Sequence, residues 1–166
     1  MTITLDAARQ WLQERLPDGT KCPCCDQHAQ IYRRTITSSM AYCMVLIARY
    51  YDAPVTPWLH VASFLAGQDR LSGRTKAAIR GDFAKLTYWH LLEEQPRKRA
   101  DGSDRAGYYR ITSQGSLFVD GGMIVPRIAV VYNGECLRLD DADGYISLKD
   151  ALGEKFNLGK LMKGSP

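Results

Sequence analysis

The chain has 166 residues, 45% of them hydrophobic and 24% charged, which is the length and composition of one globular domain or one domain with a small addition. Its longest apolar run, residues 40–48, is too short for the ~20 residues of a membrane span, and residues 1–6 lack the basic and apolar regions of a signal peptide. We therefore expect a cytoplasmic protein with no membrane partner, and the net charge of +4 indicates a nucleic-acid partner only weakly by itself.

The first predicted element is an amphipathic helix over residues 5–16, on which leucine and alanine side chains share one face. A Pro-Asp-Gly sequence at residues 17–19 ends this helix, because these residue types favour turns. Three of the five cysteines follow in the tight loop Cys22-Pro-Cys-Cys25. We assign residues 1–29 to this helix and cysteine loop.

The cysteine loop has the spacing of a zinc half-site at Cys22 and Cys25, and His28 adds a third donor nearby. Structural zinc needs four ligands, generally from two half-sites, and here the second half-site is missing, which leaves Cys43 or His60 as the fourth ligand. A reduced turn that packs the N-terminal segment onto the rest is a second interpretation. A redox-active thiol pair is a third, although the thioredoxin-like context is absent. A structural zinc is thus one hypothesis among three, and no cofactor is certain.

Three helices are predicted between residues 37 and 94. Thr37 or Ser38 caps the first, which runs to about Tyr51. Thr56 caps the second, with Pro57 at its first position. The third runs over residues 74–94, and its inner face is formed by Ile79, Phe83, Leu86 and His90.

A basic loop over residues 96–105, with a turn at its tip, follows the third helix. Residues 108–112 then have the β-rich chemistry of a strand. Thr112 is placed to cap another helix, on which Gly115 and Phe118 would face inward.

This order of helix, basic hairpin and the pattern Y-x-I-T-x-x-G-x-x-F resembles the recognition helix and wing of winged helix-turn-helix proteins. The resemblance implies an α+β, mainly helical fold in which residues 30–120 form a winged-helix domain. It also implies that the third helix enters the major groove of duplex DNA and that the hairpin loop holds the backbone. The residues expected at the groove are Arg74, Thr75, Lys76 and Arg80, and those expected at the backbone are Arg97, Lys98, Arg99 and Arg105.

The distribution of charge favours the same surface. Between Asp69 and Ile111, ten Lys or Arg residues stand against six Asp or Glu residues. Between Asn133 and Asp150, by contrast, five acidic residues stand against two basic ones. The excess of positive charge therefore lies on the predicted helix and wing, as expected of a phosphate-facing surface.

The C-terminal part, residues 121–166, is predicted as a small appendage of a β-hairpin and short helices. Asn133-Gly134 between two β-rich runs indicates a type I′ turn, which needs two residues with positive φ. Ser147 followed by Asp150 resembles a capping box for a short helix, and another helix is expected around residues 158–162.

The cysteine loop, the winged helix and the C-terminal segments Val-Tyr-Asn-Gly-Glu and Ile-Ser-Leu-Lys-Asp-Ala-Leu-Gly also look like small bacteriophage-encoded proteins without assigned function. That resemblance implies a viral protein that acts in the cytoplasm of a bacterial host. The function expected is double-stranded DNA binding, for transcriptional or replication control, with a homodimer as one form of the protein.

The alternative is a winged helix that binds a host or viral protein and modulates its machine. In that case the acidic C-terminal hairpin or the Trp/Tyr surface would be the sensitive region. An enzyme is not expected, because the chain has no phosphate-binding Gly-rich loop with Lys, no G-x-S-x-G and no H-E-x-x-H sequence.

Overall fold

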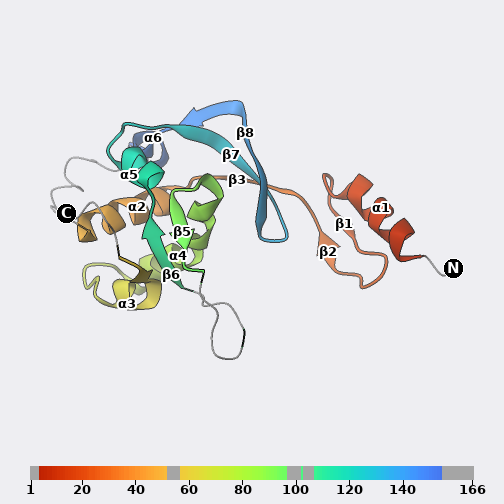
Figure 1. Cartoon of the computed structure of the whole chain (residues 1–166), viewed down its shortest axis with the longest axis horizontal. Helices are drawn as coiled ribbons and strands as arrows, with labels where there is room; N and C mark the ends of the chain where they lie inside the picture. The colour runs from red at the N-terminus through yellow and green to blue at the C-terminus, as the bar shows by residue number, and fades with distance from the viewer. Residues whose placement is uncertain (1–3, 52–56, 97–101, 103–106, 155–166) are drawn as a thin grey trace.

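A computed structural model describes residues 4–51, 57–96, 102 and 107–154 (Figure 1). Helices make up 42% of it and strands 27%, in three sheets. The expectation of a mainly helical fold is therefore wrong, and the architecture is α+β. The difference arises in the C-terminal half, where two long strands stand in place of a short hairpin.

The elements follow one another along the chain in this order: α1 (Leu5–Arg15), β1 (Thr20–Lys21), β2 (His28–Ala29), β3 (Tyr32–Thr35), α2 (Ser38–Tyr50), β4 (Leu59–His60), α3 (Val61–Ala66), α4 (Gly73–Asp82), the 3₁₀ helix η1 (Ala84–Trp89), β5 (Leu92–Glu94), β6 (Tyr108–Ile111), α5 (Ser113–Val119), β7 (Val125–Tyr132), β8 (Glu135–Ile146) and α6 (Leu148–Leu152). The three sheets have the strand orders β1-β2, β3-β7-β8 and β4-β6-β5, and every pairing is antiparallel.

Helix α2 lies at the centre of the core. The Thr37 side chain caps it by accepting a hydrogen bond from the Met40 backbone N–H, as predicted. Seven of its residues are buried, and it packs against α4, α5 and α6. Because so much of its surface is apolar, the helix is covered on several sides at once rather than along one stripe.

The C-terminal strands share this core and are not an appendage. Strand β7 pairs on one side with β8 and on the other with β3, which comes from before α2 in the sequence (Figure 1). The turn is confirmed as predicted, since Asn133 and Gly134 have φ values of 49° and 82°. Ser147 and Asp150 form the predicted capping box at α6. The domain bounds 1–29, 30–120 and 121–166 stay a prediction, and the helix expected at 158–162 lies outside the described residues.

The predicted third helix is shorter than expected. Helix α4 ends at Asp82, and the chain continues as the tighter η1 up to Trp89. His90 then adopts a left-handed conformation, with φ of 56°, and is exposed rather than packed. Leu91 and Leu92, which are adjacent in sequence, are both buried. A helix cannot easily bury such a pair together with its inner stripe, whereas a turn into strand β5 can.

The predicted second helix also begins later than expected, at Val61 instead of Pro57. Leu59 and His60 form strand β4, whose partners on β6 are Tyr109 and Tyr108. Leu59 and His60 therefore form a strand instead of the first turn of the helix, because they pair with a segment almost fifty residues away. Local capping patterns do not reveal such a pairing. Thr56 lies outside the described residues.

Gly115 lies in α5, where it closely contacts the backbone at the start of β5. A Cβ atom at this position would overlap the Leu91 carbonyl oxygen and crowd the Ile111 side chain. Thr112 reinforces the contact, because its hydroxyl donates to the His90 carbonyl oxygen (2.6 Å) and accepts from the Gly115 N–H (2.9 Å).

We expect Gly115→Ala to lower the free energy of unfolding by about 1–3 kcal/mol, since the new methyl group must displace backbone. The neighbouring exposed position supplies a control, because Ser116→Ala should change stability by less than about 0.5 kcal/mol. Urea denaturation measures both. Equal stabilities of the two variants would show that the contact at Gly115 is loose.

A second prediction concerns Arg33, whose guanidinium bridges Asp140 (2.9 Å) and Asp143 (2.8 Å) and so ties β3 across the sheet to β8. The Ala142 backbone N–H and the Arg33 guanidinium lower the pKa of Asp140 below its ordinary 3.8. A lowered carboxyl pKa contributes stability that is present above 3.8 and is lost as the pH falls through the folded-state value.

Asp140→Asn should therefore reduce the urea midpoint at neutral pH, and its difference from the wild type should shrink as the pH falls below 3.8. Asp120→Asn, at an exposed carboxylate that forms no ion pair with a described residue, is the matched control and should leave the midpoint almost unchanged. A pH-independent difference for Asp140→Asn would contradict the ionic explanation.

Candidate nucleic-acid interface

Helix α4 is held in the fold by its cap and one buried face. The Ser72 hydroxyl accepts a hydrogen bond from the Thr75 backbone N–H (3.2 Å) at its start. Ile79, and Phe83 directly after the helix, are almost fully buried, and Leu86 continues this face into η1. Those three positions are the inner face that the sequence spacing predicts.

The opposite face of α4 is open and carries small residues between positive charges. Arg74, Ala77 and Arg80 are exposed. A Cβ atom added at Gly73 or Gly81 would have no neighbour within 4 Å. These two glycines are therefore not required by packing within the described part of the fold, although glycine inside a helix costs stability.

A cavity of about 260 Å³ lies directly on this face, between α3 and α4. A larger, shallow cavity of about 430 Å³ lies elsewhere, between η1 and β8. The residues of α4 that line the smaller cavity are Gly73, Lys76, Ala77 and Arg80. Lys76 is half-buried along its wall, whereas Arg80 is exposed. The arrangement places two cations four residues apart at the rim of a groove between successive helices.

The cations of α4 are not engaged by any carboxylate of the described residues. Arg74, Lys76 and Arg80 form no ion pair within the part of the chain that is described. Asp82, the acidic residue of α4, is instead engaged by Lys85 (2.8 Å) and by the Ser39 hydroxyl. The positive charges therefore remain free to bind an external anion.

Thr75 differs from its expected role. It is half-buried, and its hydroxyl lies 2.9 Å from the Ser72 hydroxyl, so it belongs to the capping arrangement at the start of α4. The sequence suggested only a contact to DNA for this side chain. The capping partner was detectable in the pattern Ser-x-x-Thr, which puts the two hydroxyls one helical turn apart.

The β5–β6 hairpin follows α4 and η1 in the sequence. Its register pairs Leu92 with Ile111 and Glu93 with Arg110. Arg110, which contributes to the basic composition of this region, forms an ion pair with Glu93 and stacks over the Trp58 ring at 4.5 Å. Its charge is thus used inside the fold, by partners that the sequence did not indicate.

The four cations predicted to contact the DNA backbone belong to the loop that joins β5 to β6. Arg97, Lys98, Arg99 and Arg105 lie outside the described residues. The described chain stops at Pro96, shortly after β5, and resumes at Gly107, directly before β6, apart from Gly102 between them.

The aromatic residues near α4 have structural roles. Trp89 is 1% exposed, and its indole N–H donates to the Pro126 carbonyl oxygen at 2.8 Å. This contact joins η1 to β7. His60 is half-buried, and its ring nitrogen lies 2.9 Å from the Ser63 hydroxyl. Trp89 therefore matches the core role predicted for it.

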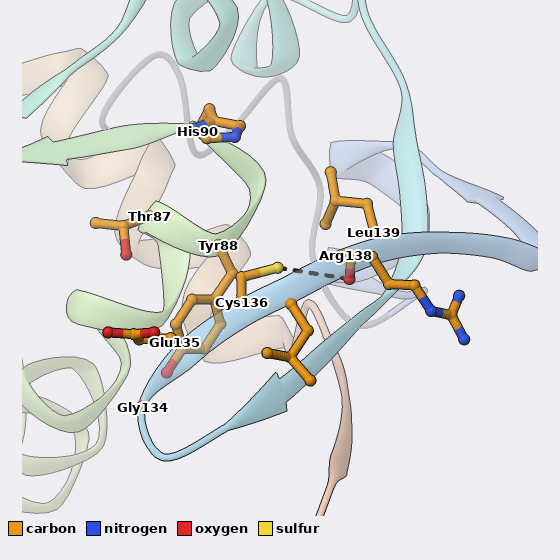
Figure 2. A pocket seen from close by; sticks show the side chains of 9 residues that line it. Thr87, Tyr88, His90, Gly134, Glu135, Cys136, Arg138 and Leu139 are labelled. Carbon is orange, nitrogen blue, oxygen red and sulfur yellow. Dashed lines mark hydrogen bonds between the residues drawn. The ribbon is translucent and has the colours of Figure 1, made fainter.

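The cavity of about 430 Å³ lies between η1 and β8 (Figure 2). In it the Cys136 thiol points along β8 toward the Arg138 carbonyl oxygen, 3.5 Å away, with Tyr88 close by. Burial raises the pKa of the Cys136 thiol, which favours the protonated, less reactive form. The geometry gives this cavity no evident nucleophile.

The cysteine loop is the turn of the β1–β2 hairpin. The Cys22 N–H donates to the Gln27 carbonyl oxygen (2.8 Å), and the Asp26 N–H donates to the Cys22 carbonyl oxygen (2.9 Å). The backbone N–H groups of Cys24 and Cys25, then the Cys25 thiol, lower the pKa of Cys22. Desolvation and the neighbouring Cys22 raise the pKa of Cys24.

The predicted metal ligands do not converge as a set of three. Among the described residues, no three His, Cys, Asp or Glu side chains are grouped so that they could hold a metal ion. His28 lies on β2, and its Nε2 is 3.3 Å from the Gln30 side-chain oxygen. Cys43, an expected fourth ligand, is fully buried in α2, and burial raises its pKa well above the ordinary value.

Comparisons with known proteins supply no relative: no family model matches the chain, and no curated protein and no solved structure matches it. No helix among the described residues is long and apolar enough to cross a membrane.

The open face of α4 leads to a stability prediction. Gly81→Ala should raise the free energy of unfolding by about 0.5–1 kcal/mol, because alanine loses less backbone entropy in a helix and has free space here. Gly134→Ala is the contrasting control: its side chain would also have free space, but the φ of 82° should make it destabilising. Thermal denaturation compares them, and a loss of stability in Gly81→Ala would mean that the position is packed.

Proposed function

We propose that the protein binds double-stranded DNA through the exposed face of α4, and that the basic sequence between β5 and β6 adds contacts to the DNA backbone. The observation that carries the proposal is the combination on one helix of three cations that form no ion pair with any described residue and two glycines at which an added Cβ atom would have no neighbour. Arg74 and Arg80 are the exposed cations of this set, and Lys76 lies at the groove between α3 and α4.

The geometry of α4 suits the major groove, which is wide enough for one helix. Gly73, Ala77 and Gly81 allow the helix backbone to approach the base edges closely. Arg74 and Arg80, at the two ends of the helix, are placed to reach phosphates or guanine edges, since arginine binds both through two parallel hydrogen bonds. The function would then be transcriptional or replication control by sequence-dependent binding.

The order of elements supports the same arrangement. Helices α3 and α4 are separated by a short turn, and α4 is followed by η1 and then by the antiparallel β5–β6 hairpin, which belongs to the sheet β4-β6-β5. A helix that follows another across a short turn is the one that enters the groove in helix-turn-helix proteins, while a following hairpin can contact the adjoining backbone.

A protein partner is the second candidate, and one observation favours it. Leu137 and Tyr145 on β8 are 54% and 49% exposed, which gives the C-terminal sheet apolar side chains on its surface. Interfaces are enriched in tyrosine and depleted of charge at their centre, but β8 also carries exposed charged residues. The α4 face therefore has the stronger support.

Fluorescence anisotropy with a labelled random-sequence duplex, over a series of salt concentrations, tests the proposal. Binding should weaken steeply with salt, because each phosphate contact adds about 0.9 to the log–log slope. Lys76→Ala with Arg80→Ala should weaken binding and make the slope shallower by up to about 1.8.

Lys21→Ala with Lys149→Ala is the charge-matched control, because both lysines are exposed and lie on β1 and α6. This control should bind nearly as well as the wild type. Equal weakening by the two double variants would show non-specific attraction to net charge rather than an interface on α4. Absence of binding by the wild type at low salt would contradict the DNA proposal and direct attention to β8.

A further inference from the structure

The N-terminal unit, residues 4–31, is separate from the main core. Helix α1 and strands β1 and β2 lie at one end of the molecule, away from α2 to α6 (Figure 1). Its buried apolar residues are Ala8 and Leu16, and neither belongs to the hydrophobic cluster around α2. Leu5 on α1 is 60% exposed.

Such a unit lacks the means to stabilise itself by packing. Domains below about 40 residues usually need disulfides, a metal ion or oligomerisation, because too little apolar surface is buried. The cysteines of this unit are not in a disulfide. The feature in it that can cross-link a chain is the hairpin turn that contains Cys22 and Cys25.

This hairpin turn has the cysteine spacing of one half of a tetrahedral thiolate site. Backbone hydrogen bonds close it on both sides of Cys22. Two cysteine sulfur atoms from one turn are ligands that a soft cation such as Zn²⁺ prefers.

The described part of the same chain does not supply the other half. All five cysteines and all three histidines lie in described segments. Cys43 is buried in α2, and Cys136 and His60 bond elsewhere in the main body. His28 is nearest in sequence, but the described residues contain no group of three donors.

We propose that two copies of the chain share one zinc ion, each contributing Cys22 and Cys25 from its hairpin turn. Tetrahedral zinc takes four thiolates, so two identical half-sites complete it, and the thiols release their protons on binding. An isologous pairing of this kind closes by two-fold symmetry. The N-terminal units then stabilise one another through the metal, and the main core remains unchanged.

The test is zinc titration of the full-length protein under reducing conditions, with metal analysis and native mass spectrometry. The expected result is one zinc ion per two chains and a species of twice 18.6 kDa that reverts to the single chain on chelation. Substitution by Co²⁺ should produce the absorption spectrum of a tetrathiolate site. One zinc ion per single chain, or no zinc at all, would overturn the proposal.

Variants separate the site from the fold and from DNA binding. Cys22→Ser and Cys25→Ser should each abolish stoichiometric zinc and the dimer, whereas Cys24→Ser, at the adjacent exposed thiol, should retain both. Circular dichroism should show the same main core in all three. Retention of zinc by Cys22→Ser, or its loss from Cys24→Ser, would overturn the proposal that Cys22 and Cys25 are the zinc ligands. Neither result would affect the separate proposal that the cations of α4 bind DNA.

Discussion

The burial of α2 is the constraint on which the rest of the structure depends. Its residues from Met40 to Ile47 are almost all inaccessible to water, and no single layer can cover such a helix. Helices α4, α5 and α6 all pack against it, so segments from distant parts of the chain must meet there. This requirement draws the C-terminal strands into the body of the fold, and β3, directly before α2, provides the edge to which β7 pairs. The exposed face of α4 is a consequence, because the helix is fixed by what its inner face must bury.

Local signals predicted much of this fold, and they failed where distant segments intervene. The caps at Thr37, Thr112 and Ser147 and the turn at Asn133-Gly134 depend on hydrogen bonds or φ values within four residues, which a sequence displays directly. The predicted third helix is too long, because the helical spacing of residues that begins with Ile79 and Phe83 continues to His90, at the turn into β5. The pairing of β5 with β6 determines where the helical segment ends. Strand pairings of this kind are also the reason that the sequence predicts more helix and less strand than the structure has.

In the candidate site, too, local features could be predicted from the sequence and long-range contacts could not. Helical periodicity sufficed to place Arg74, Lys76 and Arg80 away from the inner face, because a helix's sides are set by its own sequence. The availability of a charge is a different property, since it depends on partners. Arg110 is held by Glu93 and Trp58, and Arg33 by two aspartates more than a hundred residues away, so counting basic residues overstates the positive surface. Similarly, Cys22 and Cys25 have the spacing of a half-site, but only the positions of the other donors show that no group of three forms among the described residues.

The two proposals concern different units of the molecule and reinforce one another only if both hold. Two chains joined at their cysteine turns would present two α4 helices to one duplex, so binding of the second helix would become intramolecular and affinity would rise without new contacts. The connection between the units matters for this effect. It runs through β3, which is hydrogen-bonded to β7 and tied by Arg33 to Asp140 and Asp143, and not through a glycine-rich linker. An edge strand that is hydrogen-bonded to its neighbour restricts the position of the unit before it, so a dimer of this kind would select DNA by half-site spacing as well as by base contacts.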